Sequence, residues 1–167
     1  MKQGTVPPTP RRHDRLIRER VHDPYKMRDK LPEPTVCPDC GAVWHAGRWT
    51  WMDHRPEGAE EHRCQACHRI ADEYPAGELV IAGEFAKTHA DEIRGLVRNQ
   101  EGLEKGERPL HRIMTIVEDD RGILVTTTDI HLPRRIGEAL HSAYEGDLDF
   151  KYDEEGYFIR VEWRRDT

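Results

Sequence analysis

Long apolar segments are missing from this chain of 167 residues. Hydrophobic residues make up 36% and charged residues 35% of the composition, and no apolar run is long enough to span a bilayer. The N-terminal stretch MKQGTVPPTPRRHDR also lacks the apolar core of a secretory signal. We therefore expect a cytoplasmic protein that has no contact with a membrane.

The sequence motifs of several common enzyme classes are absent as well. There is no Gly-x-x-x-x-Gly-Lys-Ser/Thr loop, no dinucleotide fingerprint and no Gly-x-Ser-x-Gly elbow, so the chain lacks the usual phosphate cradles and the acyl-transfer nucleophile. The ten histidines include no His-Glu-x-x-His pattern. The adjacent Asp119 and Asp120 are more typical of a turn than of a catalytic pair. We expect no enzymatic activity and no nucleotide cofactor.

Cysteine is scarce, and its four copies form two pairs. Two Cys-x-x-Cys motifs, Cys37-Pro-Asp-Cys40 and Cys64-Gln-Ala-Cys67, are separated by 23 residues. A tight turn at each motif brings two sulfurs toward one ion, and the two turns together complete a tetrahedral shell. Gly41 supplies the positive φ that such a turn often needs. The spacing predicts one structural zinc ion bound by Cys37, Cys40, Cys64 and Cys67.

Two other uses of these cysteines stay open. One is redox chemistry, although the βαβ context of a thioredoxin-like pair is absent around residue 37. The other is replacement of one sulfur by a histidine, since His45, His62 and His68 lie close in sequence. With four cysteines present, a surface or outer-shell position is the simpler interpretation for these histidines.

Charge is distributed unevenly along the chain. Residues 1–30 contain nine Lys or Arg against four Asp or Glu, net +5, whereas residues 31–167 contain 17 against 28, net −11. Residues 1–10 are rich in Pro, Thr and Gly and are typical of a disordered segment. We predict a basic, partly disordered arm over residues 1–34. Its candidate contacts to RNA phosphates are Arg11, Arg12, Arg15, Arg18 and Arg20.

The cysteine motifs lie in a segment that we assign to a zinc ribbon, residues 35–76. Its long loop predicts a hairpin with strands at 43–45 and 48–52. This hairpin contains three tryptophans, Trp44, Trp49 and Trp51. Either the three rings pack over a metal site that has little core of its own, or they form an exposed platform on which RNA bases stack.

Residues 77–167 show an alternating pattern of strands and helices. In chain order, the pattern predicts a strand at 79–81, a helix at 84–104, strands at 111–118 and 122–128, a helix between Asp129 and Gly146, and strands at 148–152 and 157–163. This order, β-α-β-β-α-β-β, is that of a ferredoxin-like two-layer αβ sandwich with one added strand. Without the first strand, two αββ units would give the same packing. The predicted fold class is α+β, with a zinc ribbon preceding the sandwich.

Each predicted helix has one apolar face, which we expect to pack on a shared sheet. The face of the first helix consists of Phe85, His89, Ile93, Leu96, Val97 and Leu103. The face of the second consists of Leu132, Ile136, Leu140 and Ala143.

Three basic side chains lie at the start of the second helix: His131, Arg134 and Arg135. The free N–H groups and the dipole of a helix N-terminus favour an anion, so these residues are candidates for holding a phosphate. The alternative is a solvated face whose arginines pair with nearby acids.

The sequence resembles the archaeal and eukaryotic adaptor family, named for nonsense-mediated decay, that escorts the large ribosomal subunit to the nuclear exit. The resemblance lies in the paired cysteine motifs and in the segments GILVTTTDIHLPRRI (122–136) and LDFKY (148–152), and it covers roughly residues 35–152. The chain is also similar to a related bacterial zinc-ribbon family of unassigned function. The adaptor family has more Cys-x-x-Cys pairs, further domains and export signals, so the resemblance implies metal binding and contact with ribosomal RNA or protein, but not export.

These patterns together predict a non-enzymatic zinc-ribbon adaptor that binds RNA in a ribosomal context. The alternative is a protein-protein adaptor or a transcription-associated ribbon that binds no RNA and whose acidic body contacts a basic partner.

Overall fold

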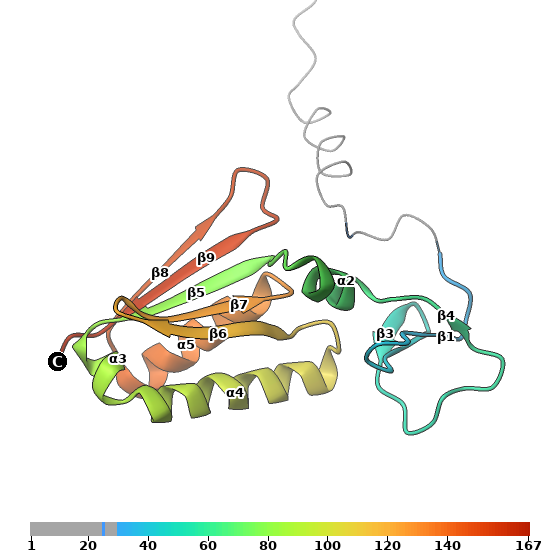
Figure 1. Ribbon diagram of the computed structural model, residues 1–167, viewed down its shortest axis with the longest axis horizontal. Coiled ribbons are helices and arrows are strands. Elements are labelled where there is room, and N and C mark those ends of the chain that lie inside the picture. Colours follow the sequence, from blue (N-terminus) through green and yellow to red (C-terminus); the bar gives the residue numbers. More distant parts are fainter. Residues whose placement is uncertain (1–24, 26–29) are drawn as a thin grey trace, which may run out of the picture.

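The computed structural model describes Tyr25 and residues 30–167. This part of the chain contains two sheets and four helices, in agreement with the predicted α+β class (Figure 1). None of these helices combines the length and the apolar character needed to cross a bilayer. The arginines predicted to contact RNA, Arg11, Arg12, Arg15, Arg18 and Arg20, lie outside the described residues.

A small four-stranded sheet forms the N-terminal part of the described chain. Its strands are β1 (Thr35–Val36), β2 (Val43–His45), β3 (Arg48–Thr50) and β4 (Glu60–Glu61), in the order β3-β2-β1-β4. The predicted hairpin is confirmed, because β2 and β3 pair antiparallel with Trp44 opposite Trp49. The turn between them has positive φ at both Ala46 and Gly47, as a type I′ hairpin turn requires.

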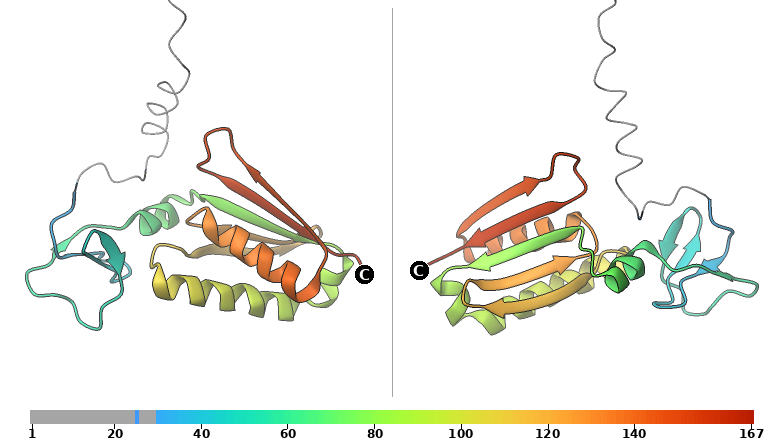
Figure 2. Two further views of the ribbon diagram at one scale, coloured as in Figure 1. Left: turned by 180° about the vertical axis from the view of Figure 1, so that it is seen from behind. Right: turned by 45° about the horizontal axis from the view of Figure 1, so that its top comes forward.

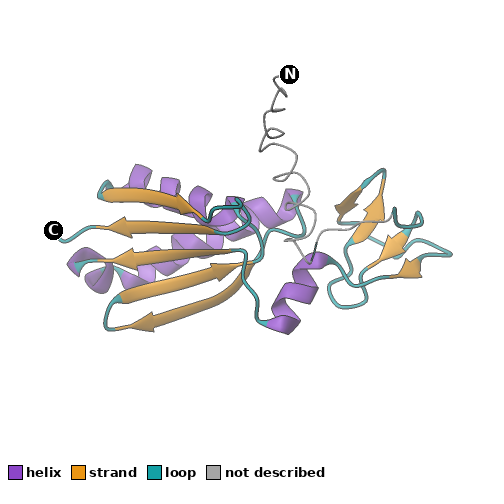
Figure 3. Cartoon of the chain, turned by 90° about the horizontal axis from the view of Figure 1, so that it is seen from above, coloured by secondary structure: helices purple, strands orange, loops and turns teal. Residues whose placement is uncertain are grey.

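A helix that the sequence did not predict follows this sheet. Helix α2 (Gln65–Asp72) begins directly after Cys64 and lies between the two sheets (Figures 1 and 3). It ends at Glu73, whose φ of 53° is typical of a helix C-terminus.

The second sheet has five strands. They are β5 (Gly77–Ala82), β6 (Ile113–Asp119), β7 (Gly122–Thr127), β8 (Asp147–Tyr152) and β9 (Ile159–Arg164), in the order β6-β7-β5-β9-β8. Strand β5 pairs parallel with β9 and antiparallel with β7, so the sheet is mixed. The last strand of the chain is inserted between β5 and β8, and the strand order does not establish the ferredoxin-like assignment.

Three helices accompany this sheet: α3 (Glu84–Thr88), α4 (Ala90–Glu107) and α5 (His131–Tyr144). Helices α4 and α5 cover one of its faces (Figures 2 and 3). The prediction of one continuous helix over 84–104 was wrong, because the chain leaves helical geometry at His89, with a φ of −117°. The His89 ring stacks on the Phe85 ring at a centroid distance of 3.9 Å. This stacking explains why His89, a polar residue, lies among apolar positions of the sequence pattern.

The main core lies between the sheet and these helices. Burial alternates along β9, where Ile159, Val161 and Trp163 are fully buried and the residues between them are exposed. Two predicted core positions are corrected. Leu103 is 54% exposed, because the neighbouring Glu104 takes the inward position, and Ala143 is exposed, because Tyr144 packs against the core in its place.

Two helical glycines provide a test of this packing. A Cβ at Gly137 of α5 would lie 2.8 Å from Cδ1 of Leu148 and 2.9 Å from Cγ1 of Val161, whereas a Cβ at Gly102 of α4 would meet nothing within 4 Å. At an open helical position, alanine is more stable than glycine by about 0.8–1 kcal/mol, while overpacking a core costs about 1–3 kcal/mol. We expect Gly102→Ala to raise the melting temperature and Gly137→Ala to lower it. Equal increases in thermal unfolding experiments would contradict the close approach of α5 to the sheet.

Candidate metal centre

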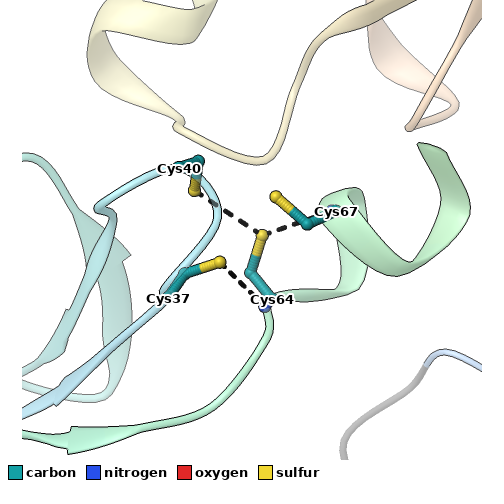
Figure 4. Close-up of side chains that lie close together, drawn as sticks. All are labelled: Cys37, Cys40, Cys64 and Cys67. Carbon is teal, nitrogen blue, oxygen red and sulfur yellow. Dashed lines mark hydrogen bonds between the residues drawn. The ribbon is translucent and has the colours of Figure 1, made fainter. Parts of the chain in front are cut away.

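The four cysteines lie together at the end of the small sheet nearest to α2 (Figure 4). Their four sulfur atoms are all within 4.8 Å of one another, and the Sγ atoms of Cys40 and Cys64 are 3.9 Å apart. Four sulfurs arranged tetrahedrally at about 2.3 Å from one ion would be separated by about 3.8 Å. The arrangement is therefore compatible with one metal ion bound by Cys37, Cys40, Cys64 and Cys67.

Two different local structures bring the cysteines of each pair together. In the first motif, the N–H of Gly41 donates to the carbonyl of Cys37, and Gly41 has the predicted positive φ, 83°. In the second motif, Cys64 precedes α2 and its sulfur accepts the N–H of Cys67 at 3.4 Å. The first turn of helix α2 therefore brings the two cysteines of the second motif together, and this motif needs no glycine with positive φ. The N–H of Cys64 donates in turn to the sulfur of Cys37 at 3.4 Å.

The centre contains a charged residue that the sequence did not reveal. Arg112, just before β6, donates from its guanidinium to the sulfurs of Cys40, Cys64 and Cys67 at 3.2, 3.3 and 3.3 Å. Its Nε donates to the carbonyl of Pro109 at 2.7 Å, and only 7% of the residue is exposed. A guanidinium has five N–H donors, so Arg112 can contact three sulfurs and the Pro109 carbonyl at once, whereas a lysine ammonium has only three donors.

The surroundings of the sulfurs favour negative charge at Cys40 and disfavour it at Cys64 and Cys67. A hydrogen bond shared with Cys64 lowers the pKa of Cys40 to about 4, and Arg112 acts in the same direction. The same hydrogen bond and burial raise the pKa of Cys64, and burial raises that of Cys67. Because four thiolates outweigh a divalent cation by two negative charges, the buried positive charge of Arg112 would stabilise the loaded centre.

The histidines near the cysteine motifs take no part in this group. His45 and His62 are exposed, and His68 is half-buried in α2. Within the described residues, the cluster of candidate ligands around the cysteines contains sulfur alone.

The tryptophans of the hairpin pack around the same centre. Trp49 is 8% exposed, and its ring meets that of Trp44 edge to face, with centroids 5.7 Å apart. Trp51 is half-buried, and its indole N–H donates to the carbonyl of Lys105 in α4 at 2.7 Å. All three rings belong to the hydrophobic cluster around the cysteines, which matches the packing interpretation rather than the stacking platform.

The three basic residues predicted to hold a phosphate are His131, Arg134 and Arg135, at the start of α5. Each of them is engaged with an acid. Arg134 donates to Glu138 at 3.1 Å, Arg135 pairs with Glu104, and Nδ1 of His131 lies 3.3 Å from the carboxylate of Asp129. This arrangement matches the alternative of paired arginines, and phosphate binding here stays a prediction.

Comparisons with protein-family models, with curated proteins and with solved structures find no match to this chain. The resemblance to the ribosomal adaptor family therefore rests on the cysteine motifs and on the segments 122–136 and 148–152 alone.

The contacts of Arg112 predict a measurable effect on metal affinity. Loss of a residue that contacts metal ligands typically weakens metal binding 10- to 100-fold. We expect Arg112→Ala to lower the metal affinity by a factor in this range. Arg112→Lys keeps the charge but loses the planar fork, so its metal affinity should lie between those of Arg112→Ala and wild type. Competition with a coloured chelator measures the affinity. Arg98→Ala, at an exposed arginine of α4, is the control, and an Arg112→Ala affinity equal to that of this control would contradict the assigned role.

Proposed function

We propose that the cysteine centre holds one structural zinc ion, bound by Cys37, Cys40, Cys64 and Cys67. Four sulfur donors suit zinc, and a shell of four protein ligands leaves no position for a substrate. Arg112 contacts three of the four sulfurs and so covers the cysteine centre on the side of the larger sheet. This cover supports a closed, structural site. The ion would stabilise the fold and take no part in a reaction.

The zinc centre would also join the two parts of the molecule. All four ligands come from the predicted ribbon, residues 35–76, while Arg112 comes from the predicted sandwich, residues 77–167. The hydrogen bond from Trp51 to Lys105 is a second link between them. Two modules held in one orientation suit an adaptor, which presents two surfaces to its partners at a constant distance.

We further propose that the protein is a cytoplasmic, non-enzymatic adaptor that binds RNA in a ribosomal context. The observation that carries this proposal is the separation of charge between residues 1–30, net +5, and residues 31–167, net −11. The basic arm would attract phosphates, and the acidic body would limit how far RNA can extend over it. The likeness to the ribosomal adaptor family supports the choice of partner, and the sandwich, which we interpret as ferredoxin-like, would supply specificity.

A protein-protein adaptor is the second candidate. It is favoured by the packing of the hairpin tryptophans, which leaves the described residues without the base-stacking platform considered above. In this case the acidic body would bind a basic protein.

The RNA proposal predicts a specific salt dependence. Replacing Arg11, Arg12, Arg15, Arg18 and Arg20 by alanine removes up to five phosphate contacts, each of which contributes about 0.7 to the slope of log affinity against log salt for single strands. Affinity for RNA and the salt slope should therefore fall together in filter-binding or anisotropy titrations. Replacing the same residues by lysine preserves the charge and should preserve most of the slope.

A pull-down with and without nuclease separates the two candidates. An RNA adaptor loses its ribosomal partners when nuclease is added. A protein partner that is retained after nuclease treatment, together with RNA affinity no higher than that of an unrelated acidic protein, would contradict the RNA proposal and support the second candidate.

A further inference from the structure

A second group of side chains that could hold a metal ion contains none of the cysteines. It consists of His111, before β6, Asp129, between β7 and α5, and His131, the first residue of α5, and the candidate ligand atoms lie within 4.8 Å of one another. Nδ1 of His131 is 3.3 Å from Oδ2 of Asp129. This separation is long for a charged hydrogen bond, but two donor atoms at about 2.1 Å from one ion lie about 3.0–3.4 Å apart.

A buried carboxylate orients one of the two imidazoles. Nδ1 of His111 lies 2.9 Å from Oε1 of Glu104, a residue that is 5% exposed. The same Nδ1 atom is 3.4 Å from Oδ2 of Asp129, so it lies between two carboxylates. The contact with Glu104 thus fixes the His111 ring beside Asp129, and a neutral imidazole has one ring nitrogen with a lone pair for a metal.

Helix capping explains only part of this group. The carboxylate of Asp129 accepts the backbone N–H of His131 at 2.7 Å and that of Leu132 at 3.3 Å, as an aspartate before a helix commonly does. Capping requires neither imidazole. The two histidine rings nevertheless lie nearly parallel beside the carboxylate, with centroids 5.4 Å apart.

The same three residues line a cavity of about 400 Å³. Its other walls include Gln65 and Ala66 of α2 and Leu110. Catalytic and ligand-binding metal sites characteristically use three protein ligands beside an open space, whereas structural sites are closed by four. The cavity has a volume within the range of small-molecule sites.

We propose that His111, Asp129 and His131 bind one divalent transition-metal ion, such as Zn²⁺, whose remaining coordination positions face this cavity. Two imidazoles and one carboxylate suit zinc and its neighbours in the first transition row. The open positions would hold water or a small anionic ligand with oxygen donors. Its three ligands are different residues from the four cysteines and from the arginines of the basic arm.

The test counts metal ions per chain. The full chain is dialysed against excess Zn²⁺, and its zinc content is determined by elemental analysis. We expect His131→Ala and Asp129→Asn each to contain one equivalent less than wild type. Both variants should fold, because the side chain of His131 is 72% exposed and asparagine at 129 can still accept the helix N–H groups.

His141→Ala is the matched control, since His141 is an exposed histidine of the same helix. It should retain the zinc content of wild type. The test compares the zinc content of each variant with that of wild type and looks for a difference of one equivalent. Its result can therefore be interpreted whether or not the cysteines also bind zinc. Equal zinc contents in wild type, His131→Ala and Asp129→Asn would overturn the assignment, and so would loss of the same equivalent in His141→Ala.

Discussion

The contact between the Arg112 guanidinium and three cysteine sulfurs is the interaction on which the arrangement of this molecule depends. A buried cation is stable only where negative charge and hydrogen-bond acceptors surround it. The three sulfurs accept its hydrogen bonds, and Cys40, whose pKa is lowered, supplies negative charge. The backbone of Arg112 is held as well, because its N–H donates to Oγ1 of Thr128 and its carbonyl accepts the N–H of Thr128. The cysteine cluster is therefore linked to the start of β6, which follows Arg112, and to the end of β7, which precedes Thr128.

Three consecutive residues, 110–112, contact the cysteine cluster or belong to the second group of candidate metal ligands. Leu110 packs against the hydrophobic cluster around the cysteines, His111 lies in the second group of candidate ligands, and Arg112 contacts the cysteine sulfurs. Helix α2 is close to both groups, since it begins at the second cysteine motif and its first residues line the cavity beside His111. A structural ion at the cysteines would thus hold α2 and this segment together, and with them the walls of the cavity.

Local patterns in the sequence predicted much of the fold. The spacing of the cysteines and the position of Gly41 indicated the cluster, because both features depend on a few neighbouring residues. The alternation of Ile159, Val161 and Trp163 likewise predicted a strand with one buried face. The sequence pattern did not predict that Glu104, and not Leu103, points toward the core. An ion pair with Arg135 stabilises the inward carboxylate of Glu104, and this pair joins two different helices.

Features that depend on distant residues were missed. Arg112 is 45 residues from Cys67 and 72 from Cys40, and a single arginine has no periodicity that marks it as buried. Helix α2 has eight residues, too few for a clear helical pattern, and it is stabilised by its position after Cys64. The insertion of β9 between β5 and β8 was also hidden, because alternation shows which face of a strand is buried but not which strands are its neighbours.

X-ray absorption spectroscopy at the zinc edge, on protein carrying one equivalent of zinc, tests the central claim most directly. A structural centre formed by Cys37, Cys40, Cys64 and Cys67 predicts a single shell of four sulfur atoms at about 2.3 Å. A shell dominated by nitrogen or oxygen at about 2.0–2.1 Å, or a chain that retains no zinc after gel filtration, would contradict it.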